Sequence, residues 1–188
     1  VDAVLGDSRI VSVVLVSRGP QYLDGTGFGP VEASYNYPPI TTEPPQTGPK
    51  VQTPAEIFAQ GLANTAKRFH DRGILVSYVL QVPELGVPAK DCLGRPLTLG
   101  VRGDLCVVSY EAYHRRMKAY RSLMQALALR RPYLRLVDLE PLFCDSVRCA
   151  AMHGKQLLYA DDNHLSVTGS RWVAPVVLQQ ALATSGSP

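Results

Sequence analysis

The sequence predicts a single α/β domain, in which a mostly parallel β-sheet is flanked by helices as an α/β sandwich. Strand-like and helix-like segments alternate three times along the chain, which is the order that builds a parallel sheet with helices packed on its faces. The chain has 188 residues, 46% of them hydrophobic, which is enough for one domain with a sizeable core. Functional side chains are expected at the carboxyl ends of the strands, where such folds bind their ligands.

The first strand–helix pair is predicted from composition and helix capping. Residues 10–16 form a short run rich in β-branched residues, bounded by an Arg-Gly-Pro turn, which predicts a buried strand. Thr53 as N-cap and Pro54 at the first helical position then begin a helix. Its apolar residues recur at helical spacing until Gly73 ends it.

The later elements follow the same alternation. Ser109 caps a long helix, and Pro132 stops it. We therefore expect one domain over residues 1–183 and a polar tail over residues 184–188. The predicted elements after the first pair are a strand over residues 74–82, a helix over about 109–131, a strand over 134–139 and a helix over 167–183.

Loops rich in Gly and Pro separate these elements. The first loop is unusually long for a compact domain, which favours either a functional or a disordered segment. Its backbone N–H groups near Arg18 could stabilise an oxyanion or belong to an ordinary Gly-Pro turn. Its tyrosines, Tyr22, Tyr35 and Tyr37, could line a sugar-binding face or be exposed residues without a partner. Glu84, after the second strand, could face the site or be an ordinary loop carboxylate. The predicted loops cover residues 18–54, 85–107 and 142–154.

The four cysteines fall into two pairs that each enclose one loop. Cys92 and Cys106 bracket a loop containing Gly and Pro, and Cys144 and Cys149 bracket a short polar one. Two local disulfides are the favoured interpretation, which implies an oxidising compartment. Zinc ligation and unpaired buried thiols are the alternatives. Neither pair has Cys-x-x-Cys spacing, and His153 is the only histidine close to either pair in sequence.

Charge and hydropathy exclude several classes of function. The net charge is only +3, and the densest basic clusters, residues 114–116 and 130–131, resemble a solvated helix face and a helix C-terminus. The aromatic and basic residues are not interleaved as single-stranded nucleic acid requires, so no nucleic-acid partner is expected. No apolar run approaches the roughly 20 residues that span a bilayer. The chain opens on Val1 without a signal peptide, which predicts a piece of a longer protein.

The densest group of reactive side chains lies just before the last predicted helix. Residues 159–169 read Tyr-Ala-Asp-Asp-Asn-His-Leu-Ser-Val-Thr-Gly. Asp161 and His164 are three residues apart, and a tight turn would place both side chains on one side of the loop. Asp161 would then accept a hydrogen bond from one ring nitrogen and leave the other free as a base. The alternative is a polar turn in which Asp162 or Asn163 caps the helix.

This string resembles the last catalytic block of the SGNH hydrolases, the GDSL-type esterases and acyltransferases. In that family a Ser, a His and an Asp form a triad, and the Asp lies three residues before the His. The resemblance implies that Asp161 orients the imidazole and that His164 is the general base. Leu165, Ser166 and Gly169 match the flanking pattern. It also implies the SGNH-hydrolase-like three-layer sandwich, and a reaction that needs no metal and no organic cofactor.

More narrowly, the chain resembles the SGNH domain fused to membrane-bound acyltransferases of family 3, which O-acylate bacterial surface polysaccharides. This implies a periplasmic domain, tethered to the inner membrane through a transmembrane acyltransferase domain of the full-length protein. The implied reaction moves an acyl group, expected to be acetyl, from an ester to a sugar hydroxyl through an acyl-enzyme. The resemblance spans about residues 10–181, and its supporting features are Arg18-Gly19-Pro20-Gln21-Tyr22, Gly25-Thr26-Gly27-Phe28-Gly29, Val82-Pro83-Glu84 and the pair Cys144 and Cys149.

The sequence does not assign the nucleophilic serine of this triad. Gly6-Asp7-Ser8 matches the triplet around the family's serine, at a plausible separation from Asp161. However, a strand-like run follows Ser8 at once, whereas the nucleophile should lead from a strand into a helix. This favours Ser8 as a turn residue, with the catalytic serine upstream and missing from this chain.

Two other classes of function remain open. A stand-alone carbohydrate esterase or deacetylase would use Ser8 as its nucleophile and turn over small esters without a membrane partner. A non-catalytic glycan-positioning domain would bind polysaccharide and hydrolyse nothing. The chain has no clear counterpart of the family's Asn block, which keeps the non-catalytic class open.

Overall fold

The main sheet has three parallel strands in the computed structural model, which describes residues 1–35, 37–38, 40–42, 51–93 and 106–183. Their order across the sheet is β1-β2-β4, and all three run toward the same edge. Their bounds are Ser12–Val16 for β1, Leu75–Val79 for β2 and Leu134–Val137 for β4. The residues that follow these strands therefore gather at one end of the molecule.

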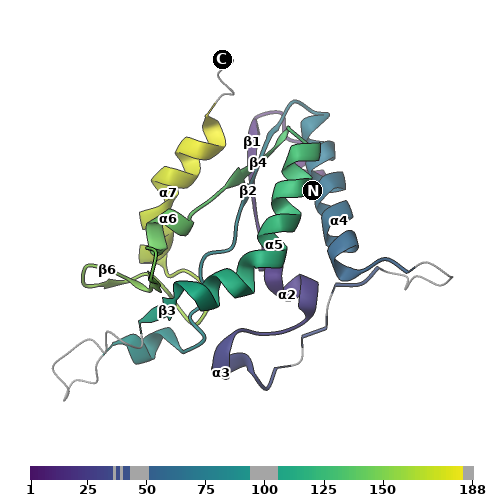
Figure 1. Ribbon diagram of the computed structural model, residues 1–188. Coiled ribbons are helices and arrows are strands. Elements are labelled where there is room, and N and C mark those ends of the chain that lie inside the picture. The colour runs from purple at the N-terminus through teal and green to yellow at the C-terminus, as the bar shows by residue number, and fades with distance from the viewer. Residues whose placement is uncertain (36, 39, 43–50, 94–105, 184–188) are drawn as a thin grey trace.

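Helices cover both faces of this sheet (Figure 1). Helices α4 (Pro54–His70) and α5 (Tyr110–Arg130) lie on one side, and α7 (Val167–Leu182) lies on the other. The chain order β1, α4, β2, α5, β4, α7 is the alternation that the sequence predicts, so the α/β sandwich is confirmed. Within the described ranges, no helix is long and apolar enough to cross a membrane.

The three long helices begin at side-chain caps. Thr53 forms a capping box with the first turn of α4, and Ser109 accepts a hydrogen bond from the first turn of α5, as expected. Such caps satisfy N–H groups that the first turn of a helix leaves without partners. The cap of α7 is Ser166, and not Asp162 or Asn163 as the polar-turn interpretation had it.

Several short elements lie in stretches predicted as loops. They are too short to show a periodic pattern, and contacts with the rest of the fold hold them. The antiparallel pairing of β3 with β5, for example, joins the segment before α5 to the second cysteine loop. These elements are α1 (Asp2–Leu5), α2 (Gly19–Asp24), α3 (Gly29–Glu32), the 3₁₀ turn η1 (Ala89–Cys92), β3 (Val107–Ser109), α6 (Glu140–Phe143), β5 (Arg148–Ala150), β6 (Met152–His153) and β7 (Gln156–Leu157).

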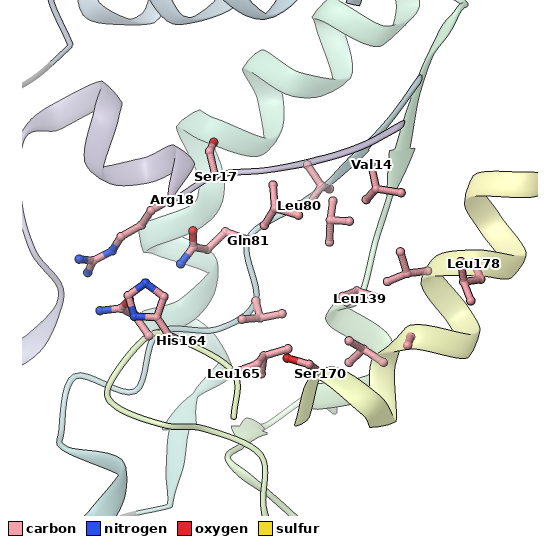
Figure 2. A pocket seen from close by; sticks show the side chains of 17 residues that line it. Val14, Ser17, Arg18, Leu80, Gln81, Leu139, His164, Leu165, Ser170 and Leu178 are labelled. Atoms are coloured by element: carbon pink, nitrogen blue, oxygen red, sulfur yellow. The ribbon is translucent and has the colours of Figure 1, made fainter. Parts of the chain in front are cut away.

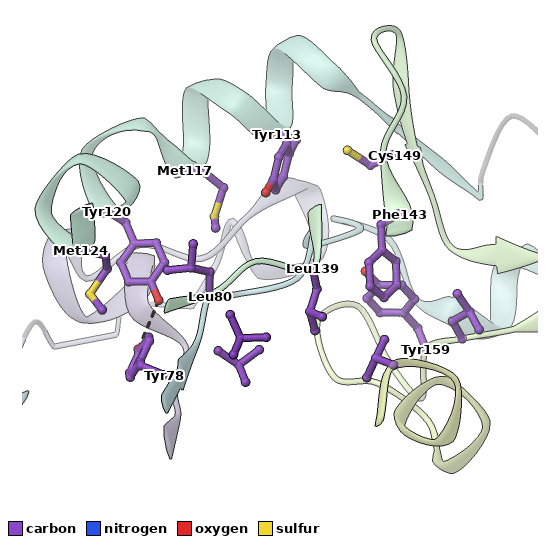
Figure 3. Close-up of a cluster of buried hydrophobic side chains, with 14 of the residues drawn as sticks. Tyr78, Leu80, Tyr113, Met117, Tyr120, Met124, Leu139, Phe143, Cys149 and Tyr159 are labelled. Carbon is purple, nitrogen blue, oxygen red and sulfur yellow. Dashed lines mark hydrogen bonds between the residues drawn. The ribbon is translucent and has the colours of Figure 1, made fainter. Parts of the chain in front are cut away.

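The core lies mainly between α5 and the sheet (Figure 3). The Tyr120 hydroxyl of α5 donates to the Tyr78 hydroxyl of β2 at 3.2 Å, which satisfies two polar groups in an apolar region. A second aromatic group joins α6 to α7, because Phe143 makes edge-on contacts with both Tyr159 and Trp172. The buried side chains of α5 are Tyr113, Met117, Tyr120 and Met124.

Strand β1 is an edge strand, so the prediction of a buried strand over residues 10–16 was wrong. Val16 is 72% exposed and Val14 39% exposed. Only β2 pairs with β1 among the described residues, and the outer edge of β1 has no strand beside it there. Composition identified the strand, but burial depends on neighbours that composition does not specify.

The structure confirms one of the two predicted disulfides. Cys144 and Cys149 are bonded. Cys92 and Cys106 are buried thiols instead, and the Cys106 thiol donates to the Cys92 carbonyl oxygen at 3.4 Å. Burial raises the pKa of Cys92 to about 12, which disfavours the reactive thiolate. The sequence predicted correctly that Cys92 and Cys106 lie close together, but it did not determine whether their sulfur atoms are bonded. Most of the loop that they enclose lies outside the described residues.

Candidate active site

The segment after β7 forms a tight turn closed by backbone hydrogen bonds. The Ala160 N–H donates to the His164 carbonyl at 2.8 Å, and Tyr159 and Leu165 pair as an isolated bridge. Inside the turn, one Asp161 oxygen accepts from the backbone N–H groups of Asn163 and His164, at 2.9 and 2.7 Å. These hydrogen bonds hold the backbone of residues 160–165 in one conformation. We call this segment the catalytic turn, after the role that the family resemblance implies for Asp161 and His164.

Asp161 and His164 meet as their spacing predicted. The second Asp161 oxygen lies 2.8 Å from His164 Nδ1. Burial alone would raise the pKa of Asp161, but the two N–H groups and the imidazole outweigh it, so the pKa lies below its ordinary value. Asp161 is thus a carboxylate that fixes the imidazole orientation. The Nε2 atom of His164 makes no hydrogen bond with the described residues and can take a proton.

The end of the motif, Ser166-Val167-Thr168-Gly169, packs the start of α7 against the strand before the turn. A Cβ built on Gly169 would lie 2.0 Å from the Leu158 carbonyl oxygen, so only glycine fits. The Gly169 N–H donates to Ser166 Oγ at 3.1 Å, and the Ser166 N–H donates to the Leu158 carbonyl at 2.8 Å. These contacts explain why the motif has Ser and Gly three residues apart.

The catalytic turn is attached to the loop that follows β2. The Tyr159 hydroxyl donates to the Pro83 carbonyl at 2.7 Å, and the Leu85 N–H donates to the Asp162 carbonyl at 2.7 Å. Both contacts lie at the carboxyl end of the parallel strands. The reactive pair therefore stands where parallel α/β sheets bind their ligands.

A groove of about 630 Å³ opens beside His164 (Figure 2). Its polar end holds Arg18, Gln81 and His164, whose side chains lie next to one another in Figure 2. Its other end is apolar and lies between the sheet and α7. The apolar lining comes mainly from Val14, Val16, Val79, Val173, Val177 and Leu178. We call this space the catalytic groove, after the role expected of His164.

Ser8 lies at the opposite end of β1 from His164. It sits in a turn just before β1, and the Leu5 carbonyl nearby accepts from Arg72, which follows α4. Ser17, at the other end of β1, lines the catalytic groove together with His164. The five residues of β1 span about 16 Å at ~3.3 Å per residue. The structure therefore does not bring Ser8 and His164 together.

A buried cluster of four charges supports the wall of the catalytic groove. Arg18 donates to Glu32 and, through Nε at 2.8 Å, to Glu84. Arg116 donates to the other Glu84 oxygen at 2.8 Å. All four side chains have little exposure: the exposed fraction is 14% for Arg18, 4% for Glu32, 1% for Glu84 and 8% for Arg116. Two cations balance two anions, which is how buried charges are tolerated. We call these four residues the charge cluster.

The charge cluster changes the interpretation of several residues. Glu84 neither faces the site nor stands free in a loop, because both of its oxygens bind arginines. Arg116 is not on a solvated helix face. Asn163 is buried, with Nδ2 3.5 Å from Glu32 Oε1. Burial alone would raise the pKa of Glu32, but the hydrogen bond from Arg18 outweighs it, and the pKa is lowered.

Sequence analysis missed the charge cluster because its members are scattered along the chain. Glu84 is 66 positions from Arg18 and 32 from Arg116. Glu32 lies in a short element with no pattern of its own. The available signals were the positions of Arg18 and Glu84 shortly after predicted strands, where parallel folds gather functional groups. No group of three His, Cys, Asp or Glu residues within the described ranges is arranged to hold a metal ion.

Comparison with known families agrees with this geometry. The family described as the SGNH domain (fused to AT3 domains) matches residues 1–179. The fold and the match define an SGNH hydrolase or acyltransferase-type domain. The chain belongs to the SGNH domains that are fused to AT3 domains, so the predicted resemblance is confirmed. No curated protein and no solved structure matches the chain.

Proposed function

We propose that this chain is the SGNH domain of an O-acyltransferase, and that Asp161 and His164 are its orienting carboxylate and general base. The observation that carries the proposal is the 2.8 Å contact between Asp161 and His164 Nδ1, at the polar end of the catalytic groove. An imidazole held by a carboxylate on one nitrogen and free on the other is the arrangement that activates a hydroxyl.

In the proposed reaction, His164 takes the proton from a serine hydroxyl as that oxygen attacks the carbonyl carbon of an ester. The tetrahedral intermediate then collapses, and the leaving alkoxide receives the proton from His164. This produces an acyl-serine and an alcohol. A sugar hydroxyl next gives its proton to His164 and attacks the carbonyl carbon of the acyl-serine. The second tetrahedral intermediate expels the serine oxygen, which takes the proton from His164, and this yields the acylated sugar and the free serine. Asp161 stabilises the imidazolium at both steps.

We propose that the serine comes from a segment upstream of Val1 rather than from Ser8. The position of Ser8 at the far end of β1 disfavours it, because His164 must reach the hydroxyl directly. The outer edge of β1 is open within the described part of the chain. A parallel strand added there would end beside Ser17, and a serine at that end would lie next to the groove that holds His164.

Labelling with a serine-reactive fluorophosphonate, followed by peptide mapping, tests this assignment. We expect no label on the 188-residue chain and a single label on a version extended upstream. Replacement of His164 by Ala should abolish the label in the extended protein while leaving its circular dichroism unchanged. A label on Ser8 that requires His164 would instead establish a complete triad, as in a stand-alone carbohydrate esterase.

The cellular setting forms the second part of the proposal. Fusion to an AT3 domain supports a membrane-tethered full-length protein, and the Cys144–Cys149 disulfide supports an oxidising compartment. We therefore place the domain in the periplasm, where it would pass an acyl group, expected to be acetyl, to a surface polysaccharide. Loss of O-acetyl groups from the surface glycan of cells that carry the His164→Ala variant would support this setting. Unchanged O-acetylation with normal protein levels would contradict both parts of the proposal.

A further inference from the structure

A second, smaller hollow is lined by Glu32 and by loop residues on either side of α3. Its volume is about 280 Å³, which is room for about nine water molecules at ~30 Å³ each. This is the scale of one small ring rather than of a long chain. The residues that matter for its chemistry are Gly25, Thr26, Gly27, Glu32, Ser34 and Tyr35. We call this space the loop hollow.

The loop hollow and the catalytic groove share one wall. Glu32 lines the hollow, whereas Arg18 and Asn163 line the groove. Glu32 Oε1 accepts from Arg18 Nη1 at 2.7 Å and lies 3.5 Å from Asn163 Nδ2. Asn163 is the residue before His164. Glu32 therefore links the two spaces: it lines the hollow and contacts two residues that line the groove.

The walls of the hollow are held in place before any ligand binds. Arg116 donates to the Thr26 carbonyl at 2.8 Å and to Asp24 at 2.9 Å. A Cβ on Gly27 would lie 2.3 Å from the Glu32 Cβ, so the loop closes directly on the charge cluster. A site shaped in advance loses little conformational entropy on binding, which favours weakly hydrophobic ligands such as sugars.

The loop hollow is lined by side-chain hydroxyls, by the backbone of glycines and by one aromatic ring. Tyr35 is 57% exposed at the rim, and Ser34 is exposed beside it. None of the described residues that line the hollow is a Lys or Arg. The nearby arginines, Arg18 and Arg116, are committed to carboxylates. The hollow therefore suits an uncharged ring with many hydroxyls, whose apolar face stacks on Tyr35.

We propose that the loop hollow is a subsite for an uncharged sugar unit of the acceptor glycan, next to the unit that is acylated. This inference rests on the proposed function for the identity of the reaction, but the binding itself does not require catalysis. Tyr35 is the stacking platform, and Ser34 and the backbone of residues 25–27 supply hydrogen bonds. The acceptor is thus recognised as an oligosaccharide rather than as a single sugar.

The three tyrosines of this loop have different roles in the structure. Tyr22 stacks on Phe58 with ring centroids 6.0 Å apart, and Tyr37 donates to Glu32 at 3.0 Å. Of the three, Tyr35 lines the hollow, and its ring also contacts the Tyr37 ring, with centroids 5.8 Å apart and planes tilted by 45°. Tyr22 is 38% exposed, lies in α2 and does not line the hollow, so Tyr22→Ala is a control for the loss of a tyrosine ring elsewhere in the chain.

Saturation-transfer NMR on the 188-residue chain tests the subsite. The probes are four oligosaccharides: maltotriose, cellotriose and chitotriose as neutral trisaccharides, and trigalacturonate as an acidic one. We expect at least one neutral probe to bind and trigalacturonate not to bind. Tyr35→Ala should weaken the neutral probe about tenfold or more, whereas Tyr35→Phe and Tyr22→Ala should bind as the unchanged chain does.

Three results would overturn the subsite: no neutral probe binds, trigalacturonate is preferred, or Tyr35→Ala binds as tightly as the unchanged chain. Thermal unfolding of each variant checks its fold, and Tyr35→Phe keeps the test valid if Tyr35→Ala does not fold. His164→Ala should bind the probe normally. Normal glycan binding together with acyl transfer by His164→Ala would therefore contradict the proposed function and leave the subsite standing.

Discussion

At the scale of single residues, the contact between Asp161 and His164 Nδ1 makes the most direct prediction about activity. Asp161→Asn would place an amide beside Nδ1 and favour the wrong imidazole tautomer, so acyl transfer should fall about 10³–10⁴-fold. Asp162→Asn is the matched control in the same turn, because its side chain makes no hydrogen bond to His164. The measurement is single-turnover acylation of the extended protein. Equal losses of activity in Asp161→Asn and Asp162→Asn would contradict the role assigned to Asp161, because any substitution in the turn would then have the same effect.

The same carboxylate predicts a dependence of stability on pH. The pKa of folded Asp161 lies below its ordinary value of 3.8, so its contribution is present above that value and is lost as pH falls through the folded pKa. The unchanged chain should therefore have a higher Tm than Asp161→Asn at pH 6, and the gap should close as pH falls below about 4. Thermal scans from pH 6 to pH 2.5 measure the gap. A constant or widening gap would contradict the assigned ionisation.

At the scale of elements, the junction between the catalytic turn and α7 makes a prediction about backbone packing. Gly169→Ala would press a methyl group against the Leu158 carbonyl, and overpacking of this kind costs about 1–3 kcal/mol. Gly61 in α4 is the matched control, since a Cβ there meets no atom within 4 Å. Gly61→Ala should stabilise the chain by about 0.5–1 kcal/mol. Urea unfolding of both variants measures whether Gly169→Ala lowers, and Gly61→Ala raises, the free energy of unfolding.

A further consequence at this scale concerns how α7 sets the catalytic geometry. Ser166 begins the helix, and Gly169 lets the first turn approach Leu158. If Gly169→Ala moves the turn, His164 moves with it, because Leu165 and Tyr159 pair across the same turn. The variant should then lose activity as well as stability, whereas Gly61→Ala should keep both.

At the scale of the whole molecule, the charge cluster joins the start of α2, the loop after β2, α3 and α5. Glu84 is 1% exposed and binds two arginines. Glu84→Gln would leave Arg18 and Arg116 without the buried carboxylate that both of them bind, and breaking a buried ion pair costs about 3–5 kcal/mol. Glu111→Gln is the control, because its i,i+4 pair with Arg115 is exposed, and it should be close to neutral. Guanidinium unfolding measures both. Similar small effects would show that the cluster contributes little to stability.

The open edge of β1 predicts the solution behaviour of the whole chain. An exposed edge strand with apolar residues can pair with a second molecule, and Val16 is 72% exposed. The 188-residue chain should therefore self-associate as its concentration rises. Val16→Lys should raise the concentration at which association begins, as light scattering would show. Val16→Ile, which keeps the apolar surface, is the control. A chain that stays monomeric at all concentrations would contradict this prediction.

Much of the scaffold was predictable because its signals are local. The caps Thr53 and Ser109 and the stop at Pro132 lie within a few residues of the helices they bound. The Asp161–His164 contact is also local, since both residues share one turn. The Cys144–Cys149 disulfide encloses a loop of a few residues. In each case the interaction depends on neighbours in the chain, which a sequence displays directly.

The α/β alternation, the boundaries of the long helices and the pairing of Asp161 with His164 could be predicted from sequence, because propensity, capping and turn geometry act over short distances. The edge position of β1, the placement of Ser8 at the far end of that strand and the contact of Arg18 with Glu84, 66 positions away, became visible only in the folded chain. These features depend on which surfaces meet when the chain folds. Burial and charge pairing are properties of that packing, and local sequence does not encode them by itself.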